Sequence, residues 1–245
     1  MIKFALVAEG ILDQVVLERI IATVFKNKTT KHLVNPIQPE RDATDQSKVA
    51  LSCFGGWEEV IAYCAKTELL KQALVVNDYI IIHIDTDVCG HKNFNIPIIL
   101  NCAPIPAKKL IADVESFLAK NLTNNFFQAN RHRIIFAVAV HSTECWFLPH
   151  YGNNAATQGA TSTCEARLKK ELTKKNIHYE KDYDIYLELS KCFKKYTDLI
   201  IYKNKCTSLG VFTDKLVALP LTPPPKIIYR AITQPHAFVF IKILP

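Results

Sequence analysis

The sequence predicts an α/β fold with a mainly parallel sheet flanked by helices, and two observations indicate it. First, apolar β-branched runs alternate with amphipathic segments over residues 1–150, an order typical of a parallel sheet covered by helices on both faces. Second, three of these runs, at residues 2–8, 79–85 and 133–141, are each followed closely by a carboxylate. In open α/β sheets, ligands bind beyond the carboxyl ends of the strands. The acidic residues therefore mark the edge of the sheet where a functional site is expected.

The first strand is expected over residues 2–8, and it ends in Glu9-Gly10. Residues 11–26 follow with apolar side chains at helical spacing, and Asp13 lies in the first turn, where a carboxylate favours the helix N-terminus. This strand–glycine–helix opening carries neither GxGxxG nor GxxxxGK[ST]. The sequence therefore argues against dinucleotide binding and against P-loop nucleotide binding.

Further elements are expected between the three strands. A short second strand, interrupted by prolines, is expected at residues 33–38, and a polar loop follows at 39–48. Helical periodicity predicts helices at 57–74 and 106–122. The irregular connection at 91–105 has room for a small hairpin.

The central stretch is YIIIHIDTDVCG at residues 79–90. Its isoleucine run predicts a buried strand with Asp85 and Asp87 at the C-terminal end. Residues two apart in an extended chain point to the same face, so these carboxylates repel each other unless a cation neutralises them. Oxygen ligands suit Mg²⁺ or Mn²⁺. Glu144, after the strand expected at 133–141, adds a further acidic group at this edge.

Several side chains near these motifs are expected to be structural. His83 lies inside an apolar strand and is expected in the core, as are Trp146 and Phe147. His141 is close enough to the acidic edge to contact a substrate.

The charge divides the chain into two regions. Residues 1–150 carry equal numbers of acidic and basic residues, and residues 151–245 hold the whole net charge of +7. We expect a carboxylate-bearing core joined to a basic, mainly helical region that packs on it. This combination is typical of a protein that handles a polyanion such as nucleic acid through a metal. The alternative is that the lysine-rich helices are merely solvated.

In the second region, helices are expected at residues 163–176, 184–197 and 208–219, and a last strand at 199–202. Residues 226–245 are apolar and β-prone, and we expect them to dock as edge strands or to form a homodimer interface. Nucleic-acid contacts are expected from the basic side chains of the first two helices, namely Arg167, Lys169, Lys170, Lys174, Lys191, Lys194 and Lys195.

The eight cysteines form no CxxC pair and lie in apolar surroundings. This usage is typical of reduced cysteines in cytosolic proteins, so we expect no zinc site. Cys89 and Cys145, which flank the acidic motifs, are expected to be buried and unreactive. The apolar run in MIKFALVAEG is too short for a secretory signal, and no run reaches the length of about 18 apolar residues that a membrane span needs. The sequence thus predicts a cytoplasmic protein with no membrane partner.

The acidic motifs resemble, in order, those of a known domain. Glu9-Gly10-x-x-Asp13, Asp85-x-Asp87 and Ser142-x-Glu144 resemble the EGxx[DE], DxD and SxE elements of the Toprim domain in nucleases of the overcoming-lysogenization-defect type. The resemblance covers residues 1–150, so the chain looks like a stand-alone Toprim protein. It is also similar to the small Toprim-like proteins of bacterial antiphage defence loci.

The resemblance implies a Toprim-like, Rossmannoid fold and a nuclease that uses Mg²⁺ or Mn²⁺ to cut DNA or RNA, with tRNA among the candidate substrates. It also implies a toxic effector controlled by a separately encoded ATPase partner. The resemblance implies one or two metal ions, with Glu9, Asp13, Asp85, Asp87 and Glu144 as ligands. Alternatively, Glu9 acts as a general acid or base. A late lysine is expected beside them, Lys203 in first place and Lys205 in second, to offset transition-state charge.

Two other functions fit part of this pattern. A DxD after an apolar strand also opens phosphatases of the haloacid-dehalogenase type, in which Asp85 would be the nucleophile and Asp87 the general acid. That fold has its DxD strand near the start of the chain and would leave Glu9-Gly10 without a role. A non-catalytic module that binds a partner is the third function, but crowded carboxylates without a use would cost stability.

Overall fold

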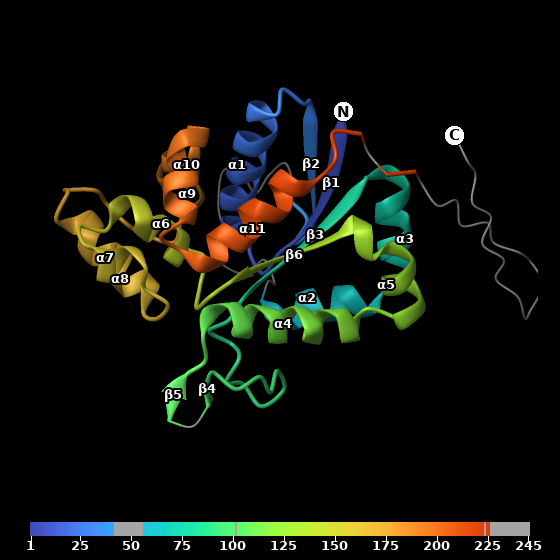
Figure 1. Cartoon of the computed structure of the whole chain (residues 1–245), viewed down its shortest axis with the longest axis horizontal. Coiled ribbons are helices and arrows are strands. Elements are labelled where there is room, and N and C mark those ends of the chain that lie inside the picture. The colour runs from blue at the N-terminus through green and yellow to red at the C-terminus, as the bar shows by residue number, and fades with distance from the viewer. Residues whose placement is uncertain (42–55, 101, 223, 226–245) are drawn as a thin grey trace, which may run out of the picture.

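The computed structural model describes residues 1–41, 56–100, 102–222 and 224–225. Its centre is a parallel sheet whose strands are β1 (Ile2–Val7), β2 (His32–Gln38), β3 (Tyr79–Asp85) and β6 (Ile134–Ala139). Their spatial order is β2-β1-β3-β6 (Figure 1). The expected α/β fold with a parallel central sheet is therefore confirmed, and it is compatible with a Rossmannoid fold.

The strand order creates a crevice between β1 and β3. β2 follows β1 in the chain and pairs on one side of it, whereas β3 pairs on the other side, with Phe4 opposite Tyr79. The winding of the chain thus reverses between these two strands. In open α/β sheets, ligands bind at such a switch point, beyond the carboxyl ends of the strands.

Helices cover both faces of the sheet (Figure 1). One layer contains α1 (Ile11–Asn27), α6 (Glu144–Tyr151) and α11 (Thr207–Ala218), and the other contains α2 (Trp57–Ala65), α3 (Thr67–Val76) and α4 (Ala107–Asn121). Successive residues of β3 point to opposite faces of the sheet. Ile81 packs in the core under α1, α6 and α11, and Ile80 and Ile82 pack in the core under α2, α3 and α4. Burial on both faces is the physical reason why this strand is apolar without alternation.

The described part of the second region, residues 151–222, contains helices and no strand. Its remaining elements are α7 (Ala155–Gln158), α8 (Cys164–Thr173), α9 (Tyr183–Leu189), the 3-10 segment η2 (Ser190–Phe193) and α10 (Tyr196–Lys203). The strand expected at residues 199–202 is wrong, because these residues lie in α10. Leu199 is fully buried and Ile201 is 52% exposed, so only one side of the helix enters the core. An apolar run as short as residues 199–202 cannot be assigned to a helix or a strand from its composition.

Smaller differences concern the connections. The helix expected at residues 57–74 is divided at Lys66 into α2 and α3. The connection after β3 does hold a hairpin, β4 (Ile99–Leu100) with β5 (Ala103–Pro104), in an arm that projects from the body (Figure 1). Before β6 the chain forms α5 (Asn124–Asn130) and η1 (Arg131–Arg133), which no pattern indicated.

Part of the expected loop at residues 39–48 and the whole stretch 226–245 lie outside the described residues. The expected edge strands and dimer interface therefore stay predictions. Among the helices that the structure describes, none combines the length and the apolar character needed to cross a membrane.

Candidate functional site

Carboxylates from distant parts of the chain line one pocket at the carboxyl ends of β1, β3 and β6. Its volume is about 310 Å³. The lining residues are Glu9, Gly10, Leu12, Asp13, Gly56, Asp85, Asp87, Ser142, Glu144, Glu165, Lys181 and Tyr186. The structure thus brings together the five carboxylates that the motifs singled out.

Glu9 and Asp85 meet at the crevice between β1 and β3. The Asp85 backbone N–H donates a hydrogen bond to Glu9 Oε1 over 2.6 Å, so the first carboxylate is attached to the end of the second strand. The Gly56 N–H donates to the Glu9 carbonyl over 2.8 Å. Gly56 has φ of +120°, which a residue with a side chain rarely adopts, so glycine is required at this wall of the pocket.

The turns after β3 and β6 are tied to each other. The Asp87 N–H donates to the His141 carbonyl over 2.9 Å, and the His141 N–H donates to Thr86 Oγ1 over 2.7 Å. These bonds hold the DxD turn against the start of the segment that carries Glu144. Their effect is to place carboxylates from both strand ends in the same pocket.

A buried histidine lies directly behind Asp85. His83 is fully buried, as expected, and packs edge-on against Trp146, which is buried as well. Its Nε2 lies 3.1 Å from Thr143 Oγ1 and 3.5 Å from Asp85 Oδ1, and Thr143 Oγ1 donates to Asp85 Oδ1 over 3.2 Å. Burial lowers the pKa of His83 to about 3, so the imidazole is neutral.

His83 also adds a nitrogen donor to the set of oxygen donors. One ligand atom from each of Asp13, His83 and Asp85 lies within 4.8 Å of the others. Because His83 lies inside an apolar run, the sequence predicted only a core residue at this position.

Four of the carboxyl groups have raised pKa values. Burial, together with the charges of Asp13 and Asp87, raises the pKa of Glu9 to about 8. Burial and the nearby Glu144 raise the pKa of Asp13 to about 7. Burial and the surrounding carboxylates raise the pKa of Asp85 well above its usual range, and the pKa of Asp87 is raised mainly by burial. Like charges in a partly desolvated pocket resist ionisation unless a cation joins them.

Glu144 differs from these four groups in that its pKa is lowered, because it accepts hydrogen bonds and lies near a positive charge. Burial alone would raise its pKa, but hydrogen bonds from Ser142 and Tyr186 and the charge of Lys181 bring it below the usual value. The Tyr186 hydroxyl donates to Glu144 Oε1 over 2.5 Å, and Lys181 Nζ lies 3.8 Å from the same oxygen. Lys181 also pairs with Glu165 over 3.0 Å. Although burial opposes it, the acidic surroundings raise the pKa of Lys181.

The lysine that lines the pocket is Lys181, and not the expected Lys203 or Lys205. Lys203 ends α10 and pairs with Asp214 over 2.5 Å, and it does not line the pocket, nor does Lys205. The expectation for Lys203 depended on a strand at residues 199–202, and the helix found there points the lysine elsewhere. No motif in the sequence singled out Lys181.

The basic residues expected to bind nucleic acid lie on two segments. α8 carries Glu165 at the pocket and Arg167, Lys169 and Lys170 on its exposed surface. Lys174 pairs with Glu171, and Lys191 pairs with Glu188. Lys194 and Lys195 are exposed in the turn between η2 and α10.

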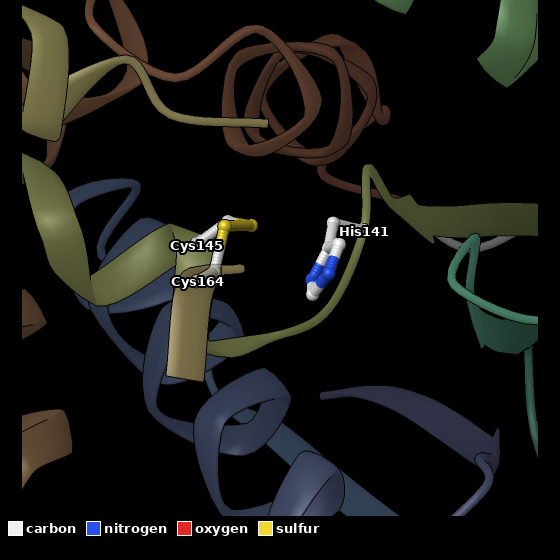
Figure 2. Close-up of side chains that lie close together, drawn as sticks. All are labelled: His141, Cys145 and Cys164. Carbon is white, nitrogen blue, oxygen red and sulfur yellow. A yellow bond between two sulfur atoms is a disulfide. The ribbon is translucent and has the colours of Figure 1, made fainter. Parts of the chain in front are cut away.

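Two cysteines beside the pocket are joined, contrary to the expectation that all are reduced. Cys145 and Cys164 form a disulfide with their Cα atoms 5.0 Å apart (Figure 2). They are separated by 19 residues and become neighbours because α6 packs against α8, a contact that the sequence does not indicate. Cys89 is a free, buried cysteine, as expected.

Comparison with protein-family models, with curated proteins and with solved structures finds no match to this chain.

Proposed function

We propose that this chain is a nuclease of the Toprim type that hydrolyses phosphodiester bonds with Mg²⁺ or Mn²⁺ held in the carboxylate pocket. One observation carries the proposal: the acidic groups of three strand ends converge in one pocket, where burial and their mutual repulsion raise the pKa values of Glu9, Asp13 and Asp85. A pocket that collects several carboxyl groups with raised pKa values is typical of a functional site. A soluble core has no structural need for it.

The donor set fits such a cation. Carboxylate oxygens are the ligands that Mg²⁺ and Mn²⁺ prefer, and the imidazole of His83 is more compatible with Mn²⁺ than with Mg²⁺. The ligands proposed are Glu9, Asp13, Asp85, Asp87 and Glu144. When bound, the cation would polarise a phosphodiester and lower the pKa of a coordinated water.

The residues of the chain have distinct roles in this proposal. Glu9, with its pKa raised to about 8, can hold or release a proton near neutral pH, which suits a general acid or base. Lys181 stays protonated and supplies positive charge at the side of the pocket for the phosphate. Tyr186 keeps Glu144 ionised by donating a hydrogen bond to it.

The contact between Glu9 and Asp85 favours a nuclease over a phosphatase. A haloacid-dehalogenase phosphatase needs Asp85 as a nucleophile and has no use for Glu9. Here the Glu9 carboxylate is held at 2.6 Å from the Asp85 amide, inside the same pocket. The roles as defence effector and as client of an ATPase partner rest on the resemblance of the motifs alone and stay predictions.

The test is cleavage of plasmid DNA and of total tRNA by the purified chain, with and without Mg²⁺ or Mn²⁺. We expect cleavage that requires the cation and that Glu9→Gln lowers by at least about a hundredfold, because removal of one essential catalytic group costs about 10²–10⁴ in rate. Glu59→Gln is the matched control, since it makes the same change on an exposed residue of α2.

Full cleavage by Glu9→Gln would contradict the proposed active site. A phosphoenzyme that forms in the parent chain and disappears in Asp85→Asn would instead support the phosphatase. Cation binding without any cleavage of either nucleic acid would support the non-catalytic module.

A further inference from the structure

A second group of potential ligands lies beside the carboxylate pocket. One ligand atom from each of His141, Cys145 and Cys164 lies within 4.8 Å of the others. Figure 2 shows the imidazole of His141 next to the disulfide, with Cys145 at the start of α6 and Cys164 at the start of α8. Both cysteines are at most 1% exposed, whereas His141 is partly exposed.

The backbone around this group is unusual. His141 has φ of +67° and Thr163, the residue before Cys164, has φ of +51°. Residues with side chains rarely adopt this left-handed conformation, and it is concentrated at functional sites. Here it brings two segments together, because the Thr163 N–H donates to His141 Nε2 over 3.0 Å.

The hydrogen bonds also define the state of the imidazole. Nε2 accepts from Thr163, so Nδ1 carries the hydrogen and donates it to Ser142 Oγ over 3.3 Å. Histidines that bind metals commonly donate their other ring N–H to an oxygen in this way. The lone pair of Nε2 is therefore available to a cation once the Thr163 N–H no longer donates to it.

We propose that His141, Cys145 and Cys164 form a redox-gated metal site for a cation of the Zn²⁺ class. In the reduced protein, the two thiolates and His141 Nε2 bind the cation, and a water completes four ligands, as in zinc sites with three protein ligands. In the oxidised protein, the disulfide of this structure uses both sulfurs and closes the site.

The change between the two states balances as thiol–disulfide exchange. A low-molecular-weight disulfide such as oxidised glutathione accepts two electrons from the two thiolates. The Cys145–Cys164 bond forms, the bond of the small disulfide breaks to two thiolates, and the cation leaves. A small dithiol reverses the step by reducing the protein disulfide and becoming oxidised itself.

The two neighbouring sites differ in the cations that they select. The carboxylate pocket offers oxygen atoms and one buried imidazole, which suit Mg²⁺ or Mn²⁺. The thiolate pair with an imidazole suits Zn²⁺ and its spectroscopic substitute Co²⁺. The second site stands independently of the proposed nuclease function.

The first measurement establishes the oxidation state. Trypsin leaves both cysteines on one peptide, residues 134–167, because no lysine or arginine lies between them. We expect this peptide to be lighter by two hydrogens and to resist alkylation in the oxidised protein, and to take up two alkyl groups after treatment with a dithiol. Two free thiols on this peptide after exposure to oxidised glutathione would overturn the proposal.

The second measurement is a titration of the whole reduced chain with Co²⁺ without oxygen, followed by absorption. We expect a thiolate-to-cobalt charge-transfer band that saturates at one ion per chain, is lost in Cys164→Ser and weakens at least about tenfold in affinity in His141→Ala, since loss of a ligand or its support costs about 10–100-fold. Addition of oxidised glutathione should release the ion to a chromophoric chelator.

The controls separate this site from the carboxylate pocket. Asp85→Asn and Cys192→Ser should both keep the band, because Asp85 supplies no sulfur and Cys192 is a free cysteine elsewhere. The oxidised parent chain must show no band, which tests the site even if Cys164→Ser does not fold. A reduced parent without the band, or an unchanged affinity for Co²⁺ in His141→Ala, would overturn the proposal.

Discussion

Both ends of the central sheet hold charged groups, in different surroundings. At the amino ends of β3 and β6, Arg133 is fully buried. Its Nε donates to the Asp78 carbonyl over 2.8 Å, and its Nη2 donates to the carbonyls of Leu74 and Asn77 over 2.9 and 2.8 Å. At the carboxyl ends, six carboxylates and one lysine line a single pocket.

The difference shows which kind of buried charge indicates function. A guanidinium surrounded by carbonyl acceptors connects the ends of α3 and β3 and has a sufficient structural explanation. Carboxyl groups whose pKa values are raised by burial and by their neighbours' charges weaken the fold when they ionise, until a cation neutralises them. An excess of carboxyl groups with raised pKa values, and not burial by itself, identifies the candidate site.

The largest expected effect is at the amino end. Arg133→Met should lower the free energy of unfolding by about 3 kcal/mol or more, because three buried carbonyls lose their donor and each unsatisfied group costs about 1–3 kcal/mol. Denaturant unfolding measures the change. Arg131→Met is the matched control on an exposed residue of the same 3-10 segment, and we expect it to change stability little. Equal effects of the two variants would refute the structural role of Arg133.

The second effect is a dependence of stability on pH at the carboxyl end. The pKa of Glu9 is raised to about 8 and that of Asp13 to about 7, both above their usual values of 4.5 and 3.8. The folded state therefore binds more protons than the unfolded state, and stability falls as the pH rises through this range. Between about pH 6.5 and about pH 8.5 we expect a loss of about 2 kcal/mol without divalent cations.

A saturating concentration of Mg²⁺ should remove most of this loss, since a ligand bound only to the folded state at 100 times its Kd adds about 2.7 kcal/mol. Denaturant unfolding at both pH values, with and without the cation, measures it. His83 contributes little to the pH dependence in this range. Burial lowers its pKa to about 3, so it destabilises the folded state only as the pH falls below its usual pKa of 6.5. Glu9→Gln should flatten the pH dependence, and an unchanged slope would contradict the assignment to Glu9.

The smallest effect is the change in stability expected for Asp87→Asn, which is opposite in sign to that expected for Arg133→Met. Without divalent cations, Asp87→Asn removes a charge from the repelling group while it keeps the shape of the side chain. Because Asp87 is exposed, solvent screens its repulsion, and we expect the free energy of unfolding to stay the same or to rise by well under about 1 kcal/mol. With Mg²⁺ present, the same variant should gain less stability from the cation than the parent chain does. A loss of more than about 1 kcal/mol in the cation-free state would mean that Asp87 has a structural role.

Local patterns in the sequence predicted the four strands and the main helices of the first region, together with the positions of its acidic residues. Short β-branched runs, amphipathic segments and glycine turns are local patterns, and they placed Glu9, Asp85 and Glu144 at or shortly after the ends of strands. A parallel sheet brings all such ends to one edge whatever the order of its strands. The convergence of these carboxylates could therefore be inferred before the order β2-β1-β3-β6 was known.

The residues of the second region that line the pocket are selected by tertiary packing. Lys181 and Tyr186 reach the pocket because α8 and α9 pack on α6 and α1, and no local pattern encodes that packing. The same packing pairs Cys145 with Cys164. The apolar run of α10 could not be distinguished from a strand until Leu199 was seen to enter the core while Ile201 remained exposed. These contacts join residues far apart in the sequence, and their free energy comes from burying surfaces against each other, which periodicity along a single segment does not record.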